Sequence, residues 1–392
     1  MPTASTPCSP SPNQPTRRSF LRMAGFAATL PVLTEGHMAW AALREAGLNP
    51  KAAASTTVPH NKPVMINANE NPLGPCEAAL DAIRASALTG GRYDATDATP
   101  ELYTTFAKVL NVPKDYLTIY AGSSDPLQYA SVGFSSKERP YVTADPGYEA
   151  GMWGAQAAGH AVLKVPLTPT YAHDVKAMVA ASPDAGLIYI CNPNNPTGTL
   201  TPKADILWAL QNKPKGAILL IDEAYIHLST TPDCLDLVRA HQDVIVLRTF
   251  SKVYGMAGIR CGAAIARPDL LKKLREYGGE NPMPITGVTA ALASLKDTTL
   301  VPTRRKIIAD TREKTLAWLT AKGYKVTPSV SNCFMVDTGK PAKDVIKAMA
   351  DKNVFIGREW PAWPNSVRVT VGTPEEMTAF QTAFADVMGH SA

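Results

Sequence analysis

The stretch TFSKVYGMAGIRCG occupies residues 249–262, close behind the apolar run VIVL at residues 244–247. A short, uninterrupted and mostly β-branched run of this kind is typical of a strand buried in a parallel sheet. Open α/β sheets bind their ligands beyond the carboxyl ends of the strands. Lys252 follows the predicted strand at that edge, so the stretch predicts an α/β fold with a ligand site at this lysine.

The side chains around Lys252 suit an anionic ligand. Thr249 and Ser251 offer hydroxyls, and Arg260 offers a guanidinium. Groups of this kind bind phosphate through charge-assisted hydrogen bonds. An amine beside a bound phosphate indicates a Schiff-base lysine that holds pyridoxal phosphate. The alternative is a solvated loop with ordinary charges, and the rest of the chain decides between the two interpretations.

Length and composition describe a globular protein with more than one core. The chain has 392 residues, of which 45% are hydrophobic and 19% charged. That length predicts one large domain and a smaller one. The net charge of +5 gives no case for nucleic-acid binding. The six cysteines show no spacing that predicts a metal site, and most sit in apolar segments, which predicts buried thiols.

The N-terminus carries a predicted export signal at residues 1–41. Arg17 and Arg18 are adjacent and stand directly before Ser-Phe-Leu, and the mildly apolar run 23–33 follows. This pattern resembles a twin-arginine signal, and Ala-Trp-Ala at 39–41 offers a cleavage site. We expect the twin-arginine export machinery as a partner and a periplasmic or exported location, or a cytoplasmic one if the signal is not functional. The alternative is a disordered basic tail. The apolar run is too short to predict a membrane span.

Strand-like and helix-like segments alternate through the middle of the chain, which predicts a mainly parallel sheet. Seven strand candidates follow one another at residues 117–121, 141–144, 161–165, 186–190, 217–221, 244–247 and 261–265. A short strand is expected from Val64, and two more near residues 332–337 and 366–371. Residues 91–281 are predicted to form the large, cofactor-binding domain. Residues 42–90 and 282–392, from both ends of the chain, are predicted to form the small α/β domain.

Two loops after predicted strands are rich in polar groups. Ser123 and Ser124 follow a glycine where a helix begins, so that free backbone N–H groups and hydroxyls suit a phosphate. The alternative is an ordinary serine-capped helix. The segment CNPNNPTG at residues 191–198 contains two Asn-Pro steps, which fix an extended turn and direct side-chain amides forward. A recognition role is predicted there, although a rigid turn is the alternative.

Two further loops complete a cofactor site. Asp222 ends an apolar strand, where a buried carboxylate costs free energy unless it meets a cation such as a protonated pyridine nitrogen. Tyr225 is placed to donate to a ring oxygen, and Tyr148 to stack on a flat ring. The alternative for Asp222 is an N-cap of the next helix. The lysine, the phosphate loop and these side chains together make pyridoxal phosphate the predicted cofactor.

The chain resembles the fold-type I, class I/II aminotransferases that depend on pyridoxal phosphate, and within them the histidinol-phosphate aminotransferase branch. The matching motifs are INANENPLGP (66–75), CNPNNPTGT (191–199), IDEAY (221–225), RTFSKVYGMAGIRCG (248–262) and SVRVTVG (366–372). They are spread over most of the chain after the signal. The resemblance implies a large domain with a seven-stranded, mostly parallel sheet, and a homodimer.

The resemblance also implies a role for each cofactor residue. Lys252 is the lysine that links to the cofactor and moves the proton, and Asp222 pairs with the pyridine nitrogen. Tyr225 and Asn195 bind the ring hydroxyl, and Tyr148 stacks on the ring. The phosphate is held by Ser123, Ser124, Thr249, Ser251 and Arg260.

The remaining implied roles concern the second subunit and the substrate. Tyr93 is expected to reach the phosphate of the neighbouring subunit. Arg368 is expected to clamp the substrate carboxylate through paired hydrogen bonds. Asn71 and Arg358 are expected to line the side-chain end of the substrate.

The chain departs from the branch on its substrate side. Asp94 stands where the family usually has proline, and residues 357–364 carry the bulky Trp360 and Trp363. These residues and the predicted export favour an aminotransferase for an aromatic or other large amino acid and a 2-oxo acid. A genuine histidinol-phosphate aminotransferase is one alternative. A decarboxylase, oxidase or cyclase is another, because the motifs specify the cofactor more than the reaction. A non-catalytic, DNA-linked sensor is disfavoured because no helix-turn-helix segment precedes the domain.

Overall fold

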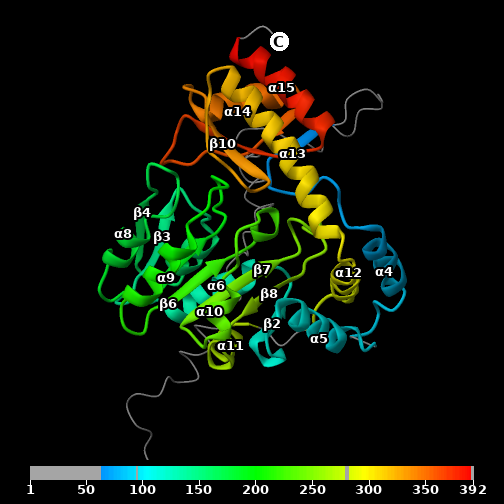
Figure 1. Ribbon diagram of the computed structural model, residues 1–392, viewed down its shortest axis with the longest axis vertical. Helices are drawn as coiled ribbons and strands as arrows, with labels where there is room; N and C mark the ends of the chain where they lie inside the picture. Colours follow the sequence, from blue (N-terminus) through cyan, green and yellow to red (C-terminus); the bar gives the residue numbers. More distant parts are fainter. Residues whose placement is uncertain (1–62, 94–95, 279–281, 390–392) are drawn as a thin grey trace, which may run out of the picture. The chain divides into compact units, whose positions relative to one another are not determined.

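The computed structural model describes residues 63–93, 96–278 and 282–389 (Figure 1). The predicted signal at 1–41 and the rest of the lead-in to residue 62 lie outside the described residues, as does Asp94. Export and cleavage therefore stay predictions.

A seven-stranded sheet lies at the centre of the large domain (Figure 1). Its order is β2-β8-β7-β6-β5-β3-β4, and β8 runs antiparallel to both of its neighbours while the other pairs are parallel. The strands are β2 (Leu117–Tyr120), β3 (Tyr141–Asp145), β4 (Val162–Pro166), β5 (Leu187–Cys191), β6 (Ile218–Asp222), β7 (Val244–Thr249) and β8 (Gly262–Ile265). The predicted sheet is confirmed, with strand ends within about two residues of those expected.

The three central strands β5, β6 and β7 are buried along their whole length. Their sequences are continuous apolar runs, as expected for strands that are covered on both faces. The helices that connect the strands of this sheet are α6 (Ser124–Phe134), α7 (Ala150–Ala157), α8 (Val175–Ala180), α9 (Lys203–Asn212) and α10 (Leu235–Arg239), and α11 (Pro268–Arg275) follows its last strand in the sequence. Helix α6 packs against α7, and α8 against α9, which leaves the carboxyl ends of the central strands to loops.

Three helices outside the alternating pattern pack on one another: α4 (Glu77–Ala87), α5 (Ala98–Leu110) and α12 (Ile285–Lys296), with α12 touching both others (Figure 1). From the sequence, Thr99 directly before Pro100 is the expected N-cap of α5, and this expectation is wrong. The cap is Asp97, without a side-chain hydrogen bond, and Thr99 already lies in the first turn. The reason is that Pro100 is tolerated within a first helical turn, so the helix begins earlier than the proline suggested.

The two ends of the described chain meet in small sheets. Strand β1 (Val64–Ile66) pairs in parallel with β11 (Val354–Ile356), and β12 (Ser366–Thr370), β10 (Cys333–Asp337) and β9 (Lys325–Val326) form an antiparallel sheet. The helices here are α13 (Leu300–Ala321), α14 (Ala342–Asp351) and α15 (Pro374–Met388), and the 3-10 turns elsewhere are η1 (Lys114–Tyr116) and η2 (Ile226–Leu228). The predicted domain boundaries after residues 90 and 281 stay predictions.

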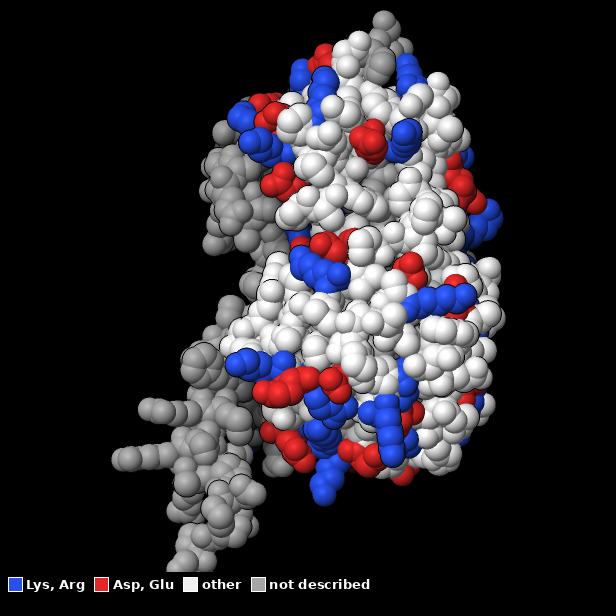
Figure 2. Space-filling model, turned by 90° about the vertical axis from the view of Figure 1, so that its left-hand side faces the viewer, with Lys and Arg blue, Asp and Glu red and all other residues white. Residues whose placement is uncertain are grey.

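Acidic and basic side chains are mixed over the face shown in Figure 2. Pairs such as Lys306 with Asp310 and Lys347 with Asp351 join opposite charges one helical turn apart. Four of the cysteines that the structure describes are buried thiols, as predicted, and Cys76 is partly exposed. Within the described residues, no helix has the length and apolar character needed to cross a membrane.

Candidate active site

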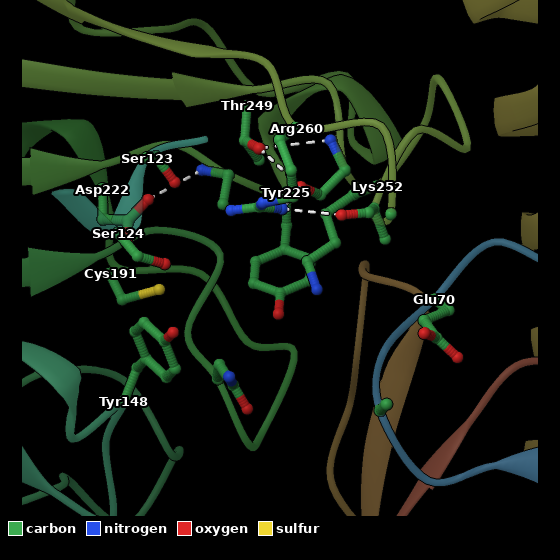
Figure 3. A pocket seen from close by; sticks show the side chains of 16 residues that line it. Glu70, Ser123, Ser124, Tyr148, Cys191, Asp222, Tyr225, Thr249, Lys252 and Arg260 are labelled. Carbon is green, nitrogen blue, oxygen red and sulfur yellow. Dashed lines mark hydrogen bonds between the residues drawn. The ribbon is translucent and has the colours of Figure 1, made fainter. Parts of the chain in front are cut away.

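A cavity of about 330 Å³ lies at the carboxyl ends of β5, β6 and β7 (Figure 3). Most of the predicted cofactor residues line it: Ser123, Ser124, Tyr148, Asn195, Asp222, Tyr225, Thr249, Ser251, Lys252 and Arg260. They come from separate loops, each of which follows a strand of the large sheet. The geometry thus brings together side chains that are more than a hundred residues apart in the sequence.

Lys252 is buried in the turn that follows β7. Its Nζ donates to the backbone oxygen of Asn69 at 2.9 Å and lies 5.2 Å from the centre of the Tyr225 ring. The amine therefore points into the cavity between the loop after β1 and the loop after β6.

An anion cradle forms one side of the cavity. Thr249 Oγ1 donates to Ser251 Oγ at 2.9 Å, and Arg260 Nη1 donates to Ser251 Oγ at 3.4 Å and to Ala257 O at 2.7 Å. Helix α6 begins beside them, with Ser123 as its N-cap and no side-chain hydrogen bond capping its first turn, so the backbone N–H groups there suit an anion. A Cβ on Gly122 would lie 2.0 Å from Arg260 Nη2, and its φ is +103°, so this position requires glycine.

Asp222 provides a buried carboxylate at the end of β6. Its Oδ2 accepts from Tyr189 Oη at 3.0 Å, and its Oδ1 accepts from Ala224 N at 3.1 Å. Burial raises the pKa of Asp222 to about 6, against the lowering effect of these hydrogen bonds. The alternative interpretation of Asp222 was an N-cap of the next helix. Its hydrogen bond with Ala224 N resembles such a cap, but the N-cap of the next helical turn, η2, is Tyr225. Asp222 therefore caps a turn and still offers its carboxylate to the cavity.

Asn69 is the main residue that the sequence analysis did not single out. It is fully buried, with φ +53°, and its Nδ2 donates to Tyr225 Oη at 3.1 Å and to Cys333 Sγ at 3.2 Å. Its backbone oxygen accepts from Lys252. Asn69 stands in a motif with two other asparagines, and nothing in the spacing distinguishes the one that contacts the lysine. Tyr189 was missed for a similar reason, because it reads as one more apolar residue of β5.

Asn71 and Tyr93 lie outside the lining of this cavity. Asn71 Nδ2 donates to Val253 O at 3.0 Å, and its Oδ1 accepts from Leu73 N, so its side chain ties two loops together. It borders a neighbouring cavity of about 320 Å³ that shares Glu70 with the first. Tyr93 is 87% exposed. Their predicted contacts with substrate and with a second subunit stay predictions.

The two predicted substrate arginines stand just behind the lining. Arg368 is fully buried, and its guanidinium donates to Asn195 Oδ1 at 3.0 Å and to Asn67 O at 2.6 Å. Arg358 forms a two-pronged ion pair with Glu149, of which the Nη1–Oε1 contact measures 3.1 Å. Glu149, next to Tyr148 in the chain, is a further residue that the sequence analysis did not identify. Among the described residues, no group of three or more His, Cys, Asp and Glu side chains is placed to hold a metal ion.

A family model described as aminotransferase class I and II matches residues 61–384. The chain belongs to this family. The histidinol-phosphate aminotransferase of Symbiobacterium thermophilum is 34% identical to this aminotransferase over 332 residues, which cover 83% of this chain and 91% of that protein. The aromatic amino acid aminotransferase of Rhodococcus jostii is 33% identical and covers 82% of this chain and 89% of that protein.

Solved structures agree with the fold. The histidinol-phosphate aminotransferase of Sinorhizobium meliloti, in complex with pyridoxal-5'-phosphate, superposes with a TM-score of 0.78 at 26% identity, over 93% of this chain and 96% of that one. The aspartate aminotransferase of Thermus thermophilus with maleate gives 0.75 at 19% identity, over 89% of this chain and 96% of that one, which supports the fold alone. The predicted fold-type I architecture is confirmed.

Pyridoxal phosphate is the cofactor of this aminotransferase, which moves an amino group between an amino acid and a 2-oxo acid. The cavity fits that cofactor on three counts. The cradle at the start of α6 suits a phosphate, and the amine of Lys252 suits an aldehyde. The carboxylate of Asp222, whose pKa burial raises, suits a protonated ring nitrogen.

Proposed function

We propose that Lys252 is the proton-moving residue of this aminotransferase and that Asp222 keeps the ring nitrogen charged. When bound, pyridoxal phosphate withdraws electrons from the Cα of the amino acid and so weakens its C–H bond. Lys252 Nζ, which contacts Asn69 O and the Tyr225 ring, lines the cavity and would take the proton from that carbon. Release from its contact with Asn69 O frees the amine to act as a base.

Asp222 and Tyr225 act on the electronics of the site. A carboxylate that is buried at the end of β6 gains most from a cationic partner, so it holds a proton on the ring nitrogen. Tyr225 Oη, fixed by Asn69 Nδ2, and the amide of Asn195 also line the cavity and would bind the ring oxygen. Thr249, Ser251 and Arg260 hold the phosphate and so fix the ring relative to Lys252.

The amino donor is proposed to be an aromatic or other large amino acid. The observation that carries this is the place of Trp360, which is fully buried beside the predicted carboxylate clamp. Its indole centre lies 5.3 Å from the guanidinium carbon of Arg368, and its Nε1 donates to Gly147 O at 3.2 Å. Trp363 packs edge-to-face on Tyr171, with ring centres 5.6 Å apart. Aromatic packing behind the clamp supports the choice of a flat apolar side chain. The similarity to the aromatic amino acid aminotransferase supports the same class.

A donor screen on the purified holoenzyme tests this choice. Phenylalanine, tyrosine, tryptophan and histidinol phosphate are each mixed with the enzyme, and the visible absorption of the cofactor is followed through one half-reaction. The aromatic donors are expected to react fastest and to yield one 2-oxo acid for each aminated cofactor. A clear preference for histidinol phosphate identifies the alternative function. Carbon dioxide or peroxide as the product contradicts transamination.

The enzyme is proposed to act as a homodimer. Tyr93, Leu88 and Leu73 are 87%, 89% and 39% exposed, and a second copy of the chain gives such large side chains a partner surface. Light scattering on the purified protein is expected to give twice the chain mass. Tyr93→Ala is expected to weaken cofactor affinity, whereas a monomeric and active wild-type enzyme contradicts the proposal.

Export through the twin-arginine route is proposed from residues 17 and 18 and the apolar run behind them. Cell fractionation is expected to place the enzyme outside the cytoplasm. Changing Arg17 and Arg18 to lysine is expected to retain it inside, with its activity intact. An unchanged distribution of this variant contradicts export by this route.

A further inference from the structure

The ion pair between Glu149 and Arg358 is nearly enclosed, with the two side chains 16% and 10% exposed. Arg358 Nη1 donates to Glu149 Oε1, and Arg358 Nη2 donates to Glu149 Oε2. The guanidinium carbon also lies 4.1 Å from the centre of the Trp360 ring. Paired hydrogen bonds and stacking on an aromatic face are the geometry in which an arginine is held most firmly. The positive charge of Arg358 is therefore balanced within the protein.

The pair lies behind the lining of the active-site cavity, next to Tyr148. Glu149 follows Tyr148, which lines the cavity, and Arg358 follows Gly357, whose ideal Cβ would lie 3.1 Å from Arg368 Nε. Trp360 touches both arginines, one at 4.1 Å and the other at 5.3 Å from its ring centre. A substrate carboxylate at Arg368 thus directs its side chain toward the partly exposed surface of Arg358 and Glu149, behind which the Trp360 ring is fully buried.

Charges near that surface do not favour an anionic side chain. Glu70 lines the cavity on the side away from Tyr148 (Figure 3), and its carboxylate adds negative charge to the site. A phosphate or carboxylate on the substrate has to take Arg358 away from Glu149, which leaves the acid partly buried without its partner. Breaking an enclosed ion pair in this way is costly because the remaining charge is poorly solvated.

We propose that Glu149 is a specificity-determining residue. By neutralising Arg358, it makes the side-chain end of the site accept neutral side chains and reject those that end in a phosphate or carboxylate. This inference rests on the proposed function, since it assigns a substrate class to the same site. Specificity here comes from cancelling a charge that would otherwise attract the wrong substrate.

Binding of unreactive acids to the holoenzyme tests the proposal without turnover. 3-Phenylpropionate carries one carboxylate and a neutral tail, and glutarate carries a second carboxylate in place of the ring. Their dissociation constants are measured by the change in cofactor absorption. In the wild type, 3-phenylpropionate is expected to bind more tightly. In Glu149→Gln, which keeps an amide acceptor for Arg358 but removes the charge, preference is expected to shift toward glutarate at least about tenfold.

The double variant Glu149→Gln/Arg358→Gln is the matched control. It removes both charges, so its preference is expected to return toward that of the wild type. Visible absorption of the bound cofactor and the thermal midpoint report whether each variant is folded. An unchanged preference in folded Glu149→Gln, or a double variant that behaves like Glu149→Gln, overturns the proposal.

Half-reaction rates separate this proposal from the proposed function. If no amino acid aminates the cofactor of the wild type, the proposed function fails while the binding result still stands. If the wild type reacts with histidinol phosphate as readily as with phenylalanine, the role of Glu149 fails while transamination stands. If it prefers phenylalanine and Glu149→Gln loses that preference, both hold.

Discussion

Replacing Asp222 by asparagine is expected to stabilise the cofactor-free protein and to lower its affinity for pyridoxal phosphate. Burial raises the pKa of Asp222 from 3.8 to about 6, so the folded protein holds this proton more tightly than the unfolded chain does. Stability is then lost as the pH rises from the unfolded pKa to the folded one, and the loss persists at higher pH. At about 1.4 kcal/mol for each pKa unit, the cost at neutral pH is about 3 kcal/mol. Asparagine has nearly the same shape and carries no charge, so it avoids this cost.

Urea unfolding of the cofactor-free protein, at one protein concentration, measures this effect. Asp222→Asn is expected to raise the free energy of unfolding by about 3 kcal/mol near pH 7.5 and by roughly half as much near pH 5. The same variant is expected to bind pyridoxal phosphate more weakly and to lose most of its turnover. The outcome that refutes the reasoning is a variant whose stability equals that of the wild type at both pH values, or whose gain is independent of pH.

Asp243→Asn supplies a control of opposite sign. Burial tends to raise the pKa of Asp243, but hydrogen bonds from Lys213 and Arg267 outweigh it, and the pKa lies below its usual value. Such a carboxylate stabilises the protein above its unfolded pKa and stops doing so as the pH falls. Asp243→Asn is therefore expected to lower stability near pH 7.5, and the loss is expected to shrink toward acid pH.

Three further substitutions test the cavity. Gly122→Ala places a methyl group on the guanidinium of Arg260 and is expected to weaken pyridoxal phosphate binding at least about tenfold in an absorption titration; unchanged affinity contradicts the cradle. Tyr189→Phe removes a hydrogen bond to a charged group, worth about 1.5–3 kcal/mol, and is expected to raise the pKa of Asp222 by about 1–2 units. The midpoint of cofactor binding as a function of pH is expected to move to higher pH, and an unchanged midpoint contradicts a role for this hydrogen bond. Trp360→Ala is expected to lower the free energy of unfolding by about 3–5 kcal/mol, and a change below 1 kcal/mol would show that the site collapses around the gap.

The large sheet and the cavity were predictable because the sequence patterns that indicate them span only a few consecutive residues. Strands such as β6 and β7 are short apolar runs, and the polar residues that follow them, Asp222 and Lys252 among others, stand at one edge of the sheet by topology alone. Order along the chain, the parallel sheet and the family resemblance were enough to predict ten residues that the structure places around one cavity.

The substrate side was less predictable because its contacts join distant segments. Glu149 reads as an ordinary acid after an aromatic residue, and only the fold brings Arg358 onto it, 209 residues away in the sequence. The same holds for Asn69, which contacts Tyr225 and Cys333 across large separations. Strands β9 and β11 escaped prediction because runs of two and three residues carry no periodicity.

Because segments near the two ends of the described chain pair with each other, parts of the fold form in a fixed order during synthesis. Strand β1 finds its hydrogen-bonding partner in β11, and Asn69 N donates to Thr370 Oγ1, a contact that spans 301 residues. The loop after β1, whose Asn69 oxygen contacts Lys252, is therefore anchored by residues that are synthesised about three hundred residues after it. A nascent or prematurely ended chain builds the central strands but lacks this anchor. Full retention of the cofactor thus reports that this anchor has formed, which is a useful checkpoint for the proposed export in a folded form.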